Sequence, residues 1–101
     1  MTTQLAEFNR VIGIPEGQTY VVIPCGTLEQ LVLNSVIITN LATERVIFYT
    51  STSDLFFDVL ENSTSRTNSL VLLPKGESLV CKSESGLSAE FQISYTGYKI
   101  V

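Results

Sequence analysis

The chain has 101 residues, of which 45% are hydrophobic and 16% charged, and its net charge is −4 with six basic residues. This length allows one domain with a single modest core. The acidic balance argues against a nucleic-acid partner, and no segment approaches the roughly 20 consecutive apolar residues of a membrane-spanning helix. We therefore expect a soluble protein, made in a cytoplasm, that contacts neither nucleic acid nor membrane.

The charged share lies below the roughly 25% that is usual, and serine, threonine and asparagine take its place. Few charges are then left to keep sheet edges apart, so we expect self-association. The absence of histidine excludes histidine-based triads and metal sites. The ten acidic residues are dispersed. Neither Pro24-Cys25-Gly26 nor Pro74-Lys75-Gly76 has the spacing of a phosphate-binding loop. We expect a protein that is not an enzyme, with no catalytic, cofactor-binding or metal-binding residues and no cofactor.

The sequence contains two cysteines, Cys25 and Cys81, each beside a predicted strand. Two interpretations are open. Both can be small buried hydrophobic residues, or they can form a disulfide, which requires Cα atoms within roughly 7 Å of each other.

The N-terminal residues 1–10 are weakly patterned and predict an arm that packs on its own domain or reaches a neighbouring subunit. The domain then comprises residues 11–101. It begins with a short apolar segment at residues 11–14, which ends at a turn containing proline and glycine. A strand rich in β-branched residues follows at residues 18–23, and Pro24-Cys25-Gly26 ends it.

The longest apolar segment, residues 28–41, predicts a single long strand. Its apolar residues change phase between Leu33 and Val36, so the polar pair at residues 34–35 indicates a β-bulge. Residues 45–50 alternate between two sides, with Val46 and Phe48 on one and Ile47 and Tyr49 on the other. We expect them to form a hairpin with the long strand.

Residues 55–60 predict a short strand after a polar loop. Within it, Phe56 and Phe57 are interpreted either as core residues or as an exposed apolar tip that contacts a partner. Residues 62–69 contain no apolar side chain and predict a solvated loop.

Two short strands, residues 70–73 and 78–82, flank the turn Pro74-Lys75-Gly76. The clearest alternation of apolar and polar residues follows at residues 87–96, Gly97 interrupts it, and residues 98–101 continue it briefly. With about eight strands, turns at intervals of roughly 8–14 residues and no helical period, the sequence predicts an all-β, single-domain antiparallel β-sandwich, jelly-roll-like in arrangement.

The turns and strands together resemble those of the small β-sandwich virion proteins of tailed bacteriophages, from about residue 18 to the C-terminus. The matching segments are YVVIPCG at 20–26, VIITN at 36–40, RVIFY at 45–49, LLPKGESL at 72–79 and AEFQISY at 89–95. Two features depart from the family's pattern. Ile23 stands where the family often has valine, and residues 55–69 form a longer insert, in which this protein would make contacts of its own.

The resemblance implies a non-enzymatic structural protein of a virion. Our first hypothesis is a capsid decoration or cement protein that binds the lattice of the major capsid protein, or other virion proteins, as a homo-oligomer; such proteins are often trimeric. The alternative is a tail, fibre or baseplate-associated module, structural or binding a receptor or glycan, for which exposed Tyr95 and Tyr98 would stack on sugars. A third hypothesis is a host-side regulatory or inhibitor module that adds a strand to the edge of a partner's sheet.

Overall fold

The computed structural model describes residues 1–50, 55–59, 63–67 and 70–101, with the backbone alone for residues 55–59. Within these ranges the chain forms strands and no helix. No described segment is therefore a helix able to cross a membrane. The strands are β1 (Thr2–Ile14), β2 (Tyr20–Ile23), β3 (Gln30–Asn40), β4 (Val46–Thr50), β5 (Leu55–Val59), β6 (Thr64–Thr67), β7 (Val71–Leu72), β8 (Leu79–Ser83) and β9 (Ala89–Ile100).

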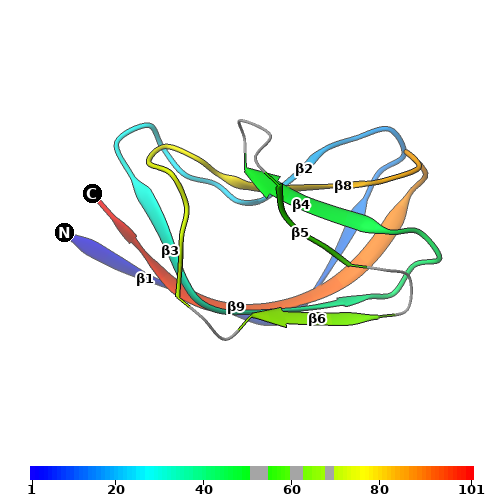
Figure 1. Cartoon of the computed structure of the whole chain (residues 1–101), viewed down its shortest axis with the longest axis horizontal. Helices are drawn as coiled ribbons and strands as arrows, with labels where there is room; N and C mark the ends of the chain where they lie inside the picture. Colours follow the sequence, from blue (N-terminus) through cyan, green and yellow to red (C-terminus); the bar gives the residue numbers. More distant parts are fainter. Residues whose placement is uncertain (51–54, 60–62, 68–69) are drawn as a thin grey trace.

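The strands form two antiparallel sheets packed face to face (Figure 1). Sheet A has the order β1-β9-β3-β6, with β7 added on β3, and sheet B has the order β2-β8-β4-β5. The pairs β1/β9, β2/β8, β3/β6 and β4/β5 are successive rungs of one long hairpin, rolled so that the rungs lie alternately in sheets A and B. This is the connectivity of a jelly roll, so the predicted all-β, jelly-roll-like sandwich is confirmed.

The core lies between the sheets and is built from alternate residues of each strand. In β9, Ala89, Phe91, Ile93 and Tyr95 are buried while the residues between them face outward. Phe91 meets Phe48 of sheet B edge to face, with ring centroids 5.2 Å apart and planes at 84°. This pair joins the two sheets at the centre of the core.

The predicted bulge in the long strand is confirmed. The register of β3 against β9 shifts between Leu33 and Ser35. Leu33 before the shift and Val36 after it are both fully buried in the core. One extra residue in β3 thus reverses the phase of the alternation and keeps both halves of the strand facing inward.

The N-terminal segment differs from the expected arm. β1 runs from Thr2 to Ile14 across the boundary predicted at residue 10, and it pairs with β9 from one end to the other. A bulge lies near that boundary, between Glu7 and Arg10, with Asn9 at φ 56°. The bulge breaks the alternation within the segment, which is why its sequence shows no strand periodicity.

The predicted hairpin of β3 with β4 is wrong, because β4 lies in sheet B between β8 and β5. The buried side chain of Asn40 makes the crossing between the sheets. Its Nδ2 donates to the carbonyl oxygen of Glu44 at 2.6 Å, and its Oδ1 accepts from the backbone N–H of Ala42 at 2.9 Å. These two bonds satisfy backbone groups of a loop that turns away from sheet A.

The polar segment at residues 62–69 is not all loop, since Thr64–Thr67 forms β6 at the edge of sheet A. An edge strand needs little apolar surface, and its threonines suit a pleated backbone. Thr64 also reaches across to Thr39, with 3.0 Å between the hydroxyl oxygens. The predicted core or tip position of Phe56 and Phe57 falls outside the described side chains.

Gly97 does not interrupt the last strand, because β9 continues through it to Ile100. A Cβ atom at Gly97 would overlap the carbonyl oxygen of Val32, which lies on the neighbouring β3 beside the bulge. The strand begins later than expected, at Ala89, and Leu87 lies outside it with 51% of its surface exposed. Glycine at residue 97 therefore allows β3 and β9 to approach closely.

We expect Gly97→Ala to destabilise the fold by about 1–3 kcal/mol, because the added methyl group forces two backbones apart. Gly13→Ala in β1 is the matched control, since a Cβ there meets nothing within 4 Å. It should leave stability unchanged or raise it by up to about 1 kcal/mol. Urea unfolding of both variants measures the difference, and equal midpoints would contradict the close approach at Gly97.

Candidate protein interface

The described residues contain no cluster of three or more Cys, Asp or Glu side chains that could hold a metal ion. An open hollow of about 710 Å³ lies at one end of the sandwich, and Glu90 is the single ionisable residue among those that line it. Its lining residues are Gly13, Ile14, Pro15, Leu41, Ala42, Thr43, Ser88, Ala89 and Glu90. This lining presents no pair of carboxylates.

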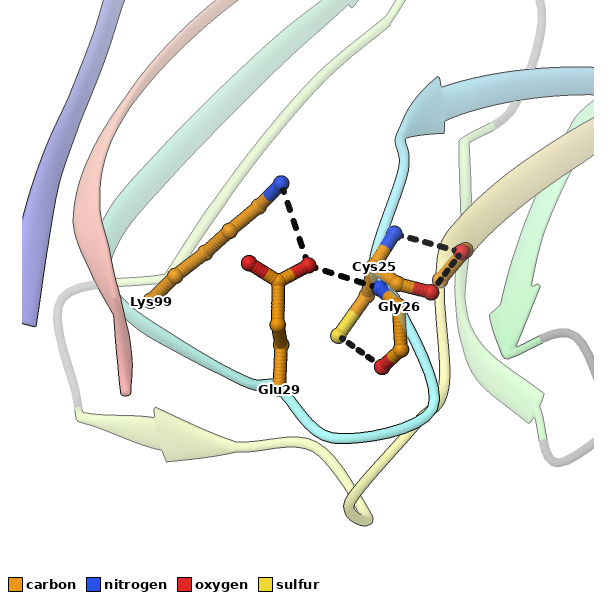
Figure 2. Close-up of polar contacts among 5 residues, drawn as sticks. Cys25, Gly26, Glu29 and Lys99 are labelled. Carbon is orange, nitrogen blue, oxygen red and sulfur yellow. Dashed lines mark hydrogen bonds and ion pairs between the residues drawn. The ribbon is translucent and has the colours of Figure 1, made fainter. Parts of the chain in front are cut away.

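The loop between β2 and β3 forms a polar corner around Glu29 (Figure 2). Glu29 Oε1 accepts from the backbone N–H of Gly26 at 2.8 Å and lies 3.8 Å from Lys99 Nζ of β9. The backbone oxygen of Glu29 accepts from the N–H of Gly76 at 2.8 Å. Ser78 Oγ accepts from the N–H of Cys25 at 2.8 Å. These bonds tie the turns Pro24-Cys25-Gly26 and Pro74-Lys75-Gly76 to the end of β9, so the role of the corner is structural.

Neither cysteine is in a disulfide. Cys81 is fully buried in sheet B, and burial raises the pKa of its thiol to about 12. Cys25 is partly exposed at the polar corner, where burial first and the nearby Glu29 second raise the pKa of its thiol. The buried interpretation therefore holds for Cys81, and Cys25 is the more accessible thiol.

The two tyrosines near the C-terminus do not form a stacking platform. Tyr95 belongs to the core with 8% of its surface exposed, and burial first and the charge of Glu7 second raise the pKa of its hydroxyl. Tyr98 lies on the opposite face of the same strand, because it is three residues further along β9. They therefore cannot hold one sugar between them.

The outer face of sheet A is a broad surface with few charges. Among the described side chains on it, the charged ones are Glu90 and Arg66, and the rest are hydroxyl, amide or apolar. The register of the strands places on this face Thr2, Gln4, Ala6, Val11 and Gly13 of β1, Glu90, Gln92, Ser94, Thr96, Tyr98 and Ile100 of β9, Gln30, Val32, Ser35, Ile37 and Thr39 of β3, Thr64 and Arg66 of β6, and Leu72 of β7.

Apolar side chains on and beside this face are left in solvent. Val11 is 54% exposed and Leu72 61%, and Phe8 at the bulge of β1 is 69% exposed. Removing water from a surface with large apolar side chains and little charge costs little solvation free energy. Such a surface is therefore suited to binding a protein partner. Sequence reasoning missed this face, because its apolar residues lie on four different strands.

No protein-family model matches the sequence, and no curated protein does. Solved structures resemble the fold. A chain of the acidic stable capsid structure of Helicobacter pylori bacteriophage KHP30 has a TM-score of 0.51 at 6% identity, covering 100% of this chain and 99% of that one. The Schizosaccharomyces pombe Cnp3 cupin domain has a TM-score of 0.47 at 9% identity, covering 95% of this chain and 61% of that one.

The structure of infectious bursal disease virus, Gx strain, contains a chain with a TM-score of 0.43 at 5% identity, covering 99% of this chain and 32% of that one. Both of the lower TM-scores are below 0.5. At 6% identity, the likeness to the phage capsid chain shows a shared fold. It extends over nearly the full length of both chains, so the rolled sandwich is the common unit.

We expect a thiol reagent at pH 8 to modify Cys25 in the native protein and Cys81 only after unfolding, because the raised pKa and burial of Cys81 keep it protonated and inaccessible. The rate at Cys25 should increase as the pH rises, since more thiolate forms. Time-resolved labelling with and without denaturant counts the two thiols. Cys25→Ser should remove the fast reaction, and equal rates for both thiols in the native protein would contradict this assignment.

Proposed function

We propose that the protein is a structural component of a bacteriophage particle, and specifically a capsid decoration or cement protein that catalyses no reaction. The observation that carries this proposal is the end-to-end likeness in fold to a chain from a phage capsid structure. The resemblance of five sequence segments to small virion proteins supports it independently. The outer face of sheet A, with its low charge, supports a role in binding proteins.

The proposed mechanism is multivalent binding. Each copy contacts the major capsid protein through the outer face of sheet A, and linked copies bridge neighbouring capsid subunits. Many weak contacts on a repeating lattice then add to a large resistance against expansion of the shell. A rigid two-sheet sandwich suits this role, because it presents a broad face without the cost of ordering a flexible chain.

The number of copies per particle tests the role. We expect hundreds of copies in purified particles, and particles that lack the protein should release their DNA at a lower temperature than complete ones. Quantitative mass spectrometry and a thermal DNA-release assay measure the two quantities. A few dozen copies or fewer would favour a tail or baseplate position instead, and unchanged thermal release would contradict the cement role.

A charged substitution tests the face. Gln92 lies in the middle of the outer face of sheet A, between Val11 of β1 and Thr39 of β3. Gln92→Lys should weaken binding to particles that lack the protein by about tenfold or more, because the interface would bury an unpaired charge. Val21→Lys is the matched control, since Val21 lies on sheet B and is 49% exposed. Equal loss in both variants, or none, would contradict the assigned face.

A further inference from the structure

β1 leaves one long side of its backbone unpaired with any described strand. It is thirteen residues long, stands at the end of the order of sheet A, and pairs with β9 on its other side. Most of its residues are exposed. Natural edge strands are commonly protected by lysine and other charged side chains, by proline, by a β-bulge or by a covering segment. In β1 the bulge and the charges of Glu7 and Arg10 lie together near the middle of the strand, and the residues on either side of them carry no charge. β1 contains neither lysine nor proline. We call this side of β1 the free edge.

The hydrogen bonds between the two chain ends show which backbone groups face the free edge. The N–H of Val101 donates to the carbonyl oxygen of Met1 at 2.9 Å, and the Met1 amino group donates to the carbonyl oxygen of Val101 at 3.4 Å. Because such pairs alternate along an antiparallel ladder, the backbone N–H and C=O groups of Thr2, Gln4 and Ala6 point away from β9.

The bulge of β1 changes this alternation. Beyond it, Arg10 pairs with Ile93 of the unbulged β9, so the groups of Val11 and Gly13 are the ones that point to the free edge. The residues that face the free edge are therefore even-numbered before the bulge and odd-numbered after it. They are also the residues whose side chains lie on the outer face of sheet A.

This phase change selects how β1 can pair with itself. Consider two copies whose β1 strands pair antiparallel along their free edges. Residues that face each other must both point their N–H and C=O groups to the free edge, and their side chains must lie on the same face of the joined sheet. Along the whole strand this holds only when the half of β1 before the bulge lies opposite the half after the bulge of the other copy. If the half before the bulge instead pairs with the same half of the other copy, the residues after the bulge have no strand opposite them. A two-fold axis through the bulge satisfies the condition for both copies at once.

The charges select one register among these. Glu7 and Arg10 are the charged side chains of β1, and they lie on either side of the bulge with Arg10 Nη1 3.5 Å from Glu7 Oε1. The register centred on the bulge places Glu7 opposite Arg10 of the second copy, and Arg10 opposite Glu7 of the second copy. The same register places Ala6 opposite Val11 and Gln4 opposite Gly13, all with groups that face the free edge.

We propose that two copies of this protein associate through their free edges in this register, so that sheet A continues from one copy into the other. The interface is isologous, with the two Phe8 residues beside the two-fold axis. Backbone hydrogen bonds would supply affinity, and the reciprocal Glu7 and Arg10 pairs would fix the register. This pairing concerns the isolated protein, and it does not depend on the proposed virion role.

Proline substitution tests the edge without breaking the fold. Ala6→Pro removes an N–H that points to the free edge and no bond to β9, so it should raise the dimer dissociation constant at least tenfold. Thr64→Pro is the matched control on β6, the opposite edge of sheet A. Its N–H also points away from the sheet, because the neighbouring Ser63 is the residue that bonds to Asn40.

Sedimentation equilibrium of the wild type and both proline variants measures association, and thermal unfolding checks their fold. We expect a dimer for the wild type and for Thr64→Pro, and a monomer for a folded Ala6→Pro. A wild type that is monomeric at its highest soluble concentration, or trimeric, would overturn the proposal. Undiminished association of Ala6→Pro, or equal loss in Thr64→Pro, would do so as well.

Exchange of charges tests the register and does not rely on proline. Glu7→Arg and Arg10→Glu should each weaken self-association at least tenfold, because each homodimer then brings four like charges together. An equimolar mixture of the two variants should form a heterodimer, since each arginine again faces a glutamate across the interface. An ion pair within one chain cannot produce this recovery. If the mixture associates no better than either variant alone, the register is wrong.

Discussion

The alternation of β9 is the constraint on which the rest of the structure depends. Its residues Ala89, Phe91, Ile93 and Tyr95 face the core without a bulge, and both of its neighbours in sheet A must follow that phase. β3 and β1 each carry one extra residue against it, at Leu33/Ser35 and at Glu7/Arg10. The two bulges keep the apolar residues inward and increase the local bending of strands. Sheet A accordingly curves beneath sheet B (Figure 1).

The same bulges shape the surface. In β3 the bulge lies beside Gly97, where only glycine allows the two backbones to come together. In β1 the bulge brings Glu7 and Arg10 to the same side of the strand, and Arg10 Nη2 donates to the hydroxyl of Tyr20 in sheet B at 3.3 Å. A device that preserves the core thus also determines which side chains the edge of sheet A offers to a partner.

The two surfaces to which our proposals assign assembly are adjacent in this molecule. The outer face of sheet A offers side chains with little charge, and the free edge of β1 offers backbone hydrogen-bonding groups. The first suits a partner of complementary shape, and the second suits a strand of matching length. A protein of this size that joins copies along one surface and binds a lattice with the other would act as a bridge between lattice positions.

Local sequence determined the strands whose pattern is strong. The sequence indicated β2, β3, β4, β5, β7, β8 and most of β9. The pair Asn34-Ser35 marked the bulge of β3, because side chains that alternate between core and solvent leave a period of two. The ends of strands followed from proline, which cannot donate a hydrogen bond to the ladder, and from glycine, which permits the backbone angles of turns. The all-β sandwich follows from these local signals alone.

Only the tertiary structure decided which strands are neighbours. Alternation reports the face on which a residue lies and says nothing of the strand beside it, so the place of β4 in sheet B depended on the crossing at Asn40. The pattern of β1 is weak because its bulge breaks the alternation, and that of β6 is weak because an edge strand buries little. Their pairing with β9 and β3 appears only in the fold. The outer face of sheet A and the free edge are likewise products of register, because they gather residues that are distant in the sequence.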